Sequence, residues 1–331
     1  MVKTIKHRRY IGLSLLLVMS CAENIQENSS LKGNCVSSVG QKPISTSYEG
    51  LFDLTVNIAI ARKNPDFEEL DRLFSTNRHS IARFLDPENA KFFGKTRNPM
   101  LTDNPLKETM PYTTPFLEDS AYSGAVARLK IIFNDKIKET YGLVESGSLG
   151  KYRMYEITAK NPLDTKGDQF TLTSYAGYLD SNNKLRNLNI KRYTEDTADS
   201  ISGMHAIHTS NTQLTDLNAI LEGLFKKALG AENVDEIWKS MGQFHWWYAN
   251  AMPYKRGSAS IAKMHIAYLL NFHAKRIGKV SIDRLHKFPK IHGIDIDVLA
   301  MTLGDPEVFA NYYKKAILSD KPLKGTPMGL P

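Results

Sequence analysis

The chain has 331 residues, of which 42% are hydrophobic and 24% are charged, and its formal net charge is +8. These values are ordinary for a globular protein, and they exclude a collagen-like chain, a low-complexity chain and a protein with many membrane spans. The length is sufficient for one large domain or two smaller ones with a proper hydrophobic core.

The first 21 residues have the features of a bacterial export signal. Four basic residues between positions 3 and 9 precede an apolar run over residues 11–19. Because this run is about half of the roughly 20 residues that a membrane-spanning helix needs, it fits the core of a signal peptide. Residues 18–21, Val-Met-Ser-Cys, resemble the bacterial lipobox. The resemblance implies removal of residues 1–20 as a signal peptide and attachment of diacylglycerol to Cys21.

Lipidation of Cys21 would determine where the protein resides. Two or three acyl chains anchor a protein stably without a transmembrane helix. We therefore expect a lipid-anchored protein of the cell envelope, held at the outer membrane, with the membrane as its first partner. Cys35 is the only other cysteine, so a lipidated chain has no intrachain disulfide. Removal of the basic signal lowers the net charge, and we expect no nucleic-acid partner.

The polar segment over residues 21–47 lacks periodicity, which predicts a flexible tether after the lipidated cysteine. The next segments have apolar residues at helical spacing. They predict a helix over residues 49–62, a second helix that begins after Asp66 and ends at Pro87, and a third over about 119–140.

The pattern changes over residues 150–195, where polar and apolar residues alternate. Such alternation predicts strands, and the polar run from Asp180 to Asn183 predicts a turn between two of them. We therefore expect a small antiparallel sheet of about three strands, inserted among the helices.

Helical periodicity returns after the sheet and continues almost to the C-terminus. The predicted helices cover residues 214–230, 234–252, 258–277 and 306–318. A Pro- and Gly-containing segment over residues 319–331 predicts a loose tail. Together these elements predict a mostly α-helical α+β fold, in which a small antiparallel sheet or hairpin is inserted into a single domain over residues 48–318.

The residues best suited to binding a ligand or taking part in a reaction lie between positions 243 and 263. Here a helix is interrupted at Pro253, a short basic turn follows, and a second helix begins at Ser258. Backbone N–H groups at a helix N-terminus attract anions such as phosphate or carboxylate, and adjacent cations strengthen that attraction. The predicted ligand-binding residues are Lys255, Arg256, Gly257, Ser258 and Ser260, of which either serine could also cap the helix.

This arrangement resembles the core of the Fic/Doc (Fido) fold, in which a helix leads into His-Pro-Phe-x-x-Gly-Asn-Gly-Arg and then another helix. Pro253, Tyr254 and Gly257 match the spacing of that motif. The resemblance also implies a hairpin upstream of the motif, as the pattern over residues 168–193 predicts.

Several positions differ from the Fido motif. Met252 replaces the histidine that deprotonates the incoming hydroxyl, and Lys255 replaces the acidic residue that holds a metal ion. Ser258 and Ser260 stand in place of the asparagine and the final arginine. The resemblance therefore implies a degenerate relative that does not transfer AMP by the usual route. The alternative is a kinked helical hairpin whose Lys and Arg side chains are merely solvated.

Three histidines are candidate catalytic residues, provided that they line a cleft: His245, His205 and His208. The last two lie three positions apart, which would place them on one side of a helix, although a loop with exposed histidines is the favoured interpretation. A zinc site needs further ligands and a supporting carboxylate, which the surrounding sequence does not supply. We expect neither a metal site nor a cofactor.

The sequence favours a membrane-anchored bacterial lipoprotein whose helical domain binds a partner at the cell envelope. The partner would be a protein or an anionic ligand of the phosphate or nucleotide type. One alternative is an enzyme, either a Fic-like transferase with altered chemistry or a hydrolase. A further alternative is a secreted effector or toxin.

Overall fold

A computed structural model describes the protein in nine segments, and the chain divides into two compact units, Met1–Lys95 and Thr96–Pro331. The predicted signal peptide, almost all of the tether, the predicted helix over residues 119–140 and most of the tail lie outside the described residues. The single domain over residues 48–318 stays a prediction. The described segments are 47–97, 113–116, 144–149, 152–164, 167–179, 185–186, 190–193, 198–201 and 204–321.

The described part of the first unit is a pair of packed helices, α2 (Tyr48–Ile60) and α3 (Phe67–Leu85), followed by the short 3-10 helix η1 (Ala90–Phe92). Both helices begin with a side-chain cap. Ser47 accepts a hydrogen bond from the Gly50 N–H at 3.2 Å, and Asp66 accepts one from the Glu69 N–H at 2.8 Å. Such caps satisfy N–H groups that have no partner within the helix. The two helices predicted for this region are confirmed.

The second unit contains a six-stranded antiparallel sheet in the order β1-β8-β4-β3-β2, with β5 paired to β4. A separate pair is formed by β6 and β7. The predicted sheet is confirmed, but it extends beyond residues 150–195 on both sides. The strands are β1 (Thr113–Phe116), β2 (Val144–Leu149), β3 (Tyr152–Lys160), β4 (Gln169–Leu179), β5 (Leu185–Arg186), β6 (Ile190–Tyr193), β7 (Ala198–Ile201) and β8 (Met204–His208).

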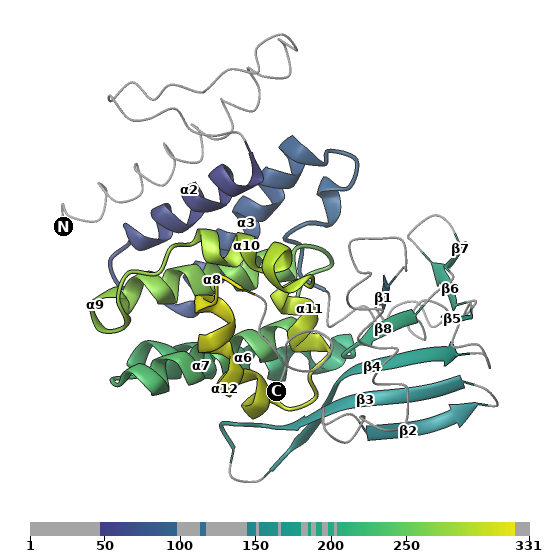
Figure 1. Ribbon diagram of the computed structural model, residues 1–331. Coiled ribbons are helices and arrows are strands. Elements are labelled where there is room, and N and C mark those ends of the chain that lie inside the picture. Colours follow the sequence, from purple (N-terminus) through teal and green to yellow (C-terminus); the bar gives the residue numbers. More distant parts are fainter. Residues whose placement is uncertain are drawn as a thin grey trace. The chain divides into compact units, whose positions relative to one another are not determined.

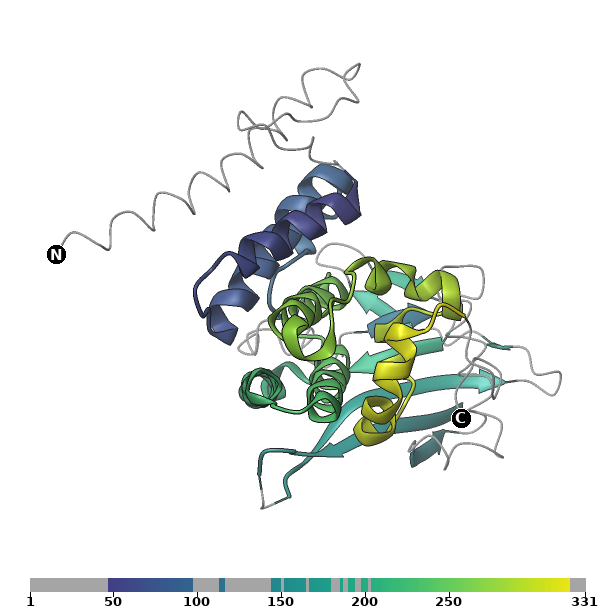
Figure 2. The same ribbon diagram turned by 60° about the vertical axis from the view of Figure 1, so that its left-hand side comes forward.

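A layer of helices lies on one side of this sheet, as both views show (Figures 1 and 2). The helix predicted over residues 258–277 is interrupted at His273, and two further helices, α10 and α11, were not predicted. The helical elements are η3 (Asn211–Gln213), α6 (Leu214–Gly230), α7 (Val234–Ala251), α8 (Ser258–Phe272), α9 (Ala274–Ile277), α10 (Asp283–His292), α11 (Ile296–Met301) and α12 (Pro306–Leu318). The mostly helical α+β fold class is thereby confirmed.

Helix α7 is the centre of this layer and packs against α6, α8, α11, α12 and strand β4. Three consecutive aromatic residues of α7 point to three different neighbours and are all buried. Trp246 donates to the Leu303 carbonyl at 2.6 Å, Trp247 meets the ring of Phe170 edge-on, and Tyr248 contacts the ring of His265. These aromatic side chains are therefore core residues that join helices and sheet.

Gly242 lies at a close backbone contact between α7 and α12. A Cβ atom at this position would lie 2.7 Å from the Ala310 Cα atom and 3.0 Å from the Tyr313 Cβ atom. We expect Gly242→Ala to lower the free energy of unfolding by about 1–3 kcal/mol, because α12 must move to make room. Urea unfolding followed by tryptophan fluorescence measures this loss, since all three tryptophans lie in α7.

Gly230→Ala is the matched control, because a Cβ atom at the end of α6 would meet nothing within 4 Å. Alanine is a better helix former than glycine by up to about 1 kcal/mol, so this variant should be neutral or slightly more stable. Equal losses in the two variants would contradict a close helix contact at Gly242.

Candidate functional site

The turn between α7 and α8 and the first residues of α8, together called here the basic turn (residues 253–260), contain hydrogen bonds of their own. Ser258 Oγ accepts from the Tyr254 N–H at 3.0 Å and lies 3.2 Å from the Tyr254 carbonyl, to which it can donate. Two residues have a positive φ angle: Met252, at 45°, ends α7, and Gly257, at 90°, precedes α8. A methionine with a left-handed backbone conformation is uncommon, so the surrounding structure must hold the backbone in this conformation.

The predicted ligand-binding residues are adjacent in this turn but differ in exposure. Arg256 is exposed, Lys255 and Gly257 are partly exposed, and Ser258 and Ser260 are buried. The expectation that a serine caps α8 is wrong for Ser258, because its hydroxyl is used within the turn. Gly257 occupies the N-cap position, so α8 begins without a side-chain cap.

Arg97 holds the start of the basic turn against the segment after β8, and the sequence did not predict this role. Its guanidinium donates to the carbonyls of Ala251 and Met252, each at 3.2 Å, and to the carbonyl of Thr209. Its Nε donates to the Asn211 side chain at 3.1 Å, and the side chain is buried. No local pattern signals this role, because these partners are more than 100 residues away in sequence.

His205 and His208 lie in strand β8 and not in a helix or an exposed loop. The ring of His208 is buried, and burial and the nearby Arg97 lower its pKa to about 3. His208 is therefore neutral at physiological pH.

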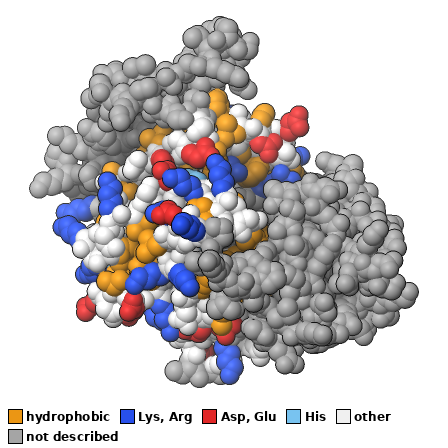
Figure 3. Space-filling view, in the orientation of Figure 1, with side chains coloured by type: hydrophobic (Ala, Val, Ile, Leu, Met, Phe, Trp, Pro, Cys, Tyr) orange, Lys and Arg blue, Asp and Glu red, His pale blue; other side chains and the backbone are white. Residues whose placement is uncertain are grey.

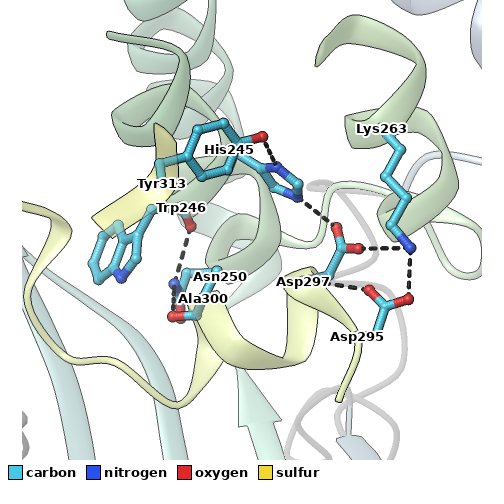
Figure 4. Close-up of polar contacts among 8 residues, drawn as sticks. All are labelled: His245, Trp246, Asn250, Lys263, Asp295, Asp297, Ala300 and Tyr313. Carbon is cyan, nitrogen blue, oxygen red and sulfur yellow. Dashed lines mark hydrogen bonds and ion pairs between the residues drawn. The ribbon is translucent and has the colours of Figure 1, made fainter. Parts of the chain in front are cut away.

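His245 is fully buried in α7 and is held on both ring nitrogens (Figure 4). Its Nδ1 lies 2.7 Å from the Tyr313 hydroxyl, and its Nε2 lies 3.0 Å from Asp297 Oδ1. A carboxylate only accepts, so Nε2 carries a proton and donates to Asp297, while Nδ1 and the Tyr313 hydroxyl share the second hydrogen bond. Burial, with the charge of Asp297, raises the pKa of Tyr313 well above its ordinary value, which keeps that hydroxyl protonated.

The contacts continue from Asp297 to Lys263 and Asp295, and these five residues together are called the His245 network (His245, Tyr313, Asp297, Lys263 and Asp295). Lys263 Nζ lies 2.6 Å from Asp295 Oδ2 and 3.3 Å from Asp297 Oδ2. Asp295 also caps α11 by accepting from the Asp297 N–H at 3.0 Å. The network thus joins α7, α8, α11 and α12.

Burial and nearby charges shift the pKa values of Asp295 and Asp297 in opposite directions. Burial alone would raise the pKa of Asp297, but Lys263 and then His245 hold it well below its ordinary value. Burial raises the pKa of Asp295 to about 6, with Lys263 opposing the shift and Asp297 adding to it. Both ring nitrogens of His245 are therefore engaged by protein groups in this arrangement, and a catalytic role for this residue stays a prediction.

The described segments contain no group of three or more His, Cys, Asp or Glu residues that could hold a metal ion. Within the same segments, no helix is both long enough and apolar enough to cross a membrane. On the face seen in Figure 3, Lys and Arg side chains alternate with Asp and Glu side chains over the helices and do not form one continuous basic patch.

Comparison with known proteins identifies the family. A family model of avirulence proteins, AvrB_AvrC, matches residues 107–316, which is well over half of the chain. The chain belongs to the AvrB_AvrC avirulence protein family. A search of curated proteins finds no match. The part that matches this avirulence family includes the basic turn and the His245 network, whereas Arg97 precedes it.

Membership in the AvrB_AvrC family overturns the main functional prediction. This is a family of bacterial effectors, which are secreted into host cells, so the interpretation as a lipoprotein lipid-anchored through Cys21 at the outer membrane of the cell envelope is wrong. The prediction failed because it rested on 21 residues, whereas the family match covers the folded region. The lipobox resemblance of residues 18–21 lies outside the described residues. The alternative of a secreted effector is the one that the family supports.

Proposed function

We propose that this AvrB_AvrC protein is a secreted bacterial effector that binds a phosphate-bearing ligand at the basic turn. The effector part of the proposal is supported by the family match over residues 107–316. The ligand part is supported by one observation above all, the start of α8 without a side-chain cap beside two cationic residues.

The charge distribution at the basic turn favours an anion. The N-terminus of α8 carries the positive end of the helix dipole and N–H groups that have no partner within the helix. Lys255 and Arg256 precede it directly, with Arg256 exposed. A phosphate group accepts several hydrogen bonds and pairs well with a guanidinium, so it fits these donors better than a neutral ligand.

The shape of the turn supports tight binding as well. Ser258 and Tyr254 bond to each other, and the Arg97 N–H donates to the Pro253 carbonyl at 2.9 Å. Thr96 pairs with Tyr254 in an isolated β-bridge. A turn that is already ordered loses little conformational freedom when a ligand binds, which improves affinity.

Binding without group transfer is the function we favour for this turn. The helix–turn–helix arrangement at residues 234–272 agrees with a distant relationship to the Fido fold, which we include in the proposal. Met252 has no group that could accept the proton of an incoming hydroxyl. His245 is buried within its own network and does not replace that missing base.

Arg256→Ala tests the ligand part of the proposal, with inorganic pyrophosphate as the probe. Loss of one charge-assisted contact costs about 1.5–3 kcal/mol, so we expect the dissociation constant to rise at least about tenfold. Isothermal titration calorimetry at low ionic strength measures the affinity, and added salt should weaken binding by the wild-type protein.

The matched control is Lys226→Ala, which removes an exposed cation of α6 that pairs with Glu222. This variant has the same change in net charge and should bind pyrophosphate as the wild type does. Equal weakening of pyrophosphate binding in both variants would indicate a general charge effect and would contradict the proposed site. Absence of binding by the wild type would do the same.

A further inference from the structure

Arg97 connects three parts of the second unit that are distant in sequence. Its guanidinium bonds to the end of α7, to the carbonyl of Thr209 just after β8, and to Asn211 in η3. Its backbone N–H bonds to the Pro253 carbonyl within the basic turn. One side chain and its own backbone therefore fix the start of the turn.

The sheet end of this connection is also fixed. Thr209 Oγ1 lies 2.7 Å from the Leu172 carbonyl and 3.2 Å from the Thr171 carbonyl of β4, and can donate to either. His208, the residue before Thr209, pairs with Thr173 of β4. Any shift of the Arg97 guanidinium therefore acts on the end of β8 and on the basic turn at the same time.

Helix polarity explains why an arginine suits this position. The last carbonyls of α7 carry the negative end of the helix dipole, and they have no partner within the helix. A planar guanidinium offers five N–H donors in a fixed geometry and can serve several carbonyls at once. A lysine carries the same charge but has a compact ammonium on a flexible stem, so it cannot serve all of these acceptors together.

We propose that Arg97 is the positioning residue of the basic turn, coupling the order of that turn to the end of β8. Arg97 acts through the backbone carbonyls of residues 251–253 and is not itself a ligand contact. The inference rests on the proposed function for its ligand, but the coupling is measurable in the protein without any ligand.

Arg97→Lys is the decisive variant, because it retains the charge and removes the fork of donors. Hydrogen exchange measured by mass spectrometry reports on the coupling directly. We expect peptides covering residues 204–211 and 252–258 to exchange about tenfold faster than in the wild type, because the carbonyls of Thr209, Ala251 and Met252 lose the guanidinium donors that hold these two segments. Peptides from α12 should be unchanged. The dissociation constant for pyrophosphate should rise about tenfold although no charge is lost.

Gly242→Ala serves as the control for general loss of stability. It lies about two and a half helical turns before the end of α7, at the contact with α12. This variant should speed exchange in α12 and leave the turn peptides and pyrophosphate affinity near wild type. If Arg97→Lys gives the same pattern as Gly242→Ala, or speeds exchange throughout the second unit, its role is merely structural and the inference is overturned.

The remaining outcomes are also decisive. Unchanged exchange in both segments overturns the inference, whatever happens to pyrophosphate affinity. Wild-type protein that fails to bind pyrophosphate counts against the proposed function alone, because the exchange comparison still decides the coupling. If Arg97→Lys does not fold, Asn211→Ala removes one acceptor of the guanidinium and is judged by the same exchange peptides and the same control.

Discussion

Asp297→Ala is expected to destabilise the protein more than any other single change proposed for the helical layer. The carboxylate is 2% exposed and lies 3.0 Å from His245 Nε2 and 3.3 Å from Lys263 Nζ. Its removal leaves the Lys263 ammonium and the buried imidazole N–H without their shared acceptor. Removal of one partner from a buried ion pair costs about 3–5 kcal/mol. Urea unfolding followed by tryptophan fluorescence measures this loss through α7.

Asp235→Ala is a matched control, because Asp235 forms an ion pair with Lys314 at 3.1 Å between α7 and α12, two of the helices that the His245 network joins. That pair is exposed, with 92% of the Asp235 side chain accessible, and exposed pairs contribute about 0–1 kcal/mol. A loss from Asp297→Ala no larger than that from Asp235→Ala would show that the His245 network does not hold the helices together.

Elements whose boundaries are set by local sequence could be predicted from the sequence. Helices α3 and α12 begin at Asp66 and Asp305, and in both cases the aspartate side chain accepts from N–H groups of the first turn. Pro253 marks the end of α7 almost to the residue. Capping, proline and glycine signals act within a few residues, so one sequence is sufficient to find them.

Helix α11 could not be predicted, because tertiary contacts stabilise it and a local sequence pattern does not. It has only six residues, too few for a clear apolar period, and it includes the charged Asp297. The sequence alone predicts that Asp297 is exposed. Only its contact with His245, 52 positions earlier, makes it part of the core. Helix α10 has Pro289 in its interior, which is a signal against a helix.

The candidate site was predicted in part for the same reason. Lys255 to Ser258 are neighbours in sequence, so their joint position in a turn needed no long-range information. The partner of Ser258 within the turn, and the part played by Arg97, depend on the packing of α7 against the end of β8. Contacts across 112 residues, such as that between Arg97 and Thr209, leave no periodic trace in one sequence.

The second large effect is a loss of stability on acidification, and it depends on His208. Burial and then Arg97 lower the pKa of this ring to about 3, whereas an unfolded chain would have a value near 6.5. Between these two values the unfolded state binds a proton that the folded state does not. The contribution of His208 to the free energy of unfolding is therefore fully present above about pH 6.5 and is lost as the pH falls toward 3. Between pH 7.5 and pH 5.0 the loss from His208 is about 2 kcal/mol.

Other groups titrate in the same window, so the test compares two proteins at both pH values. His273 and His292 also have lowered pKa values and act in the same direction as His208. Asp295 acts in the opposite direction, because its raised pKa favours the folded state as the pH falls. These contributions are common to the wild type and to His208→Gln, and they cancel in the difference between the two.

We therefore expect the wild type to lose about 2 kcal/mol more than His208→Gln between pH 7.5 and pH 5.0, measured by urea unfolding at each pH. The pH-independent cost of the substitution itself also cancels, because each protein is compared with itself. Identical pH dependence in both proteins would mean that His208 is not held neutral beside Arg97. A smaller loss in the variant would show that the packing around Arg97 makes the end of β8 sensitive to acid.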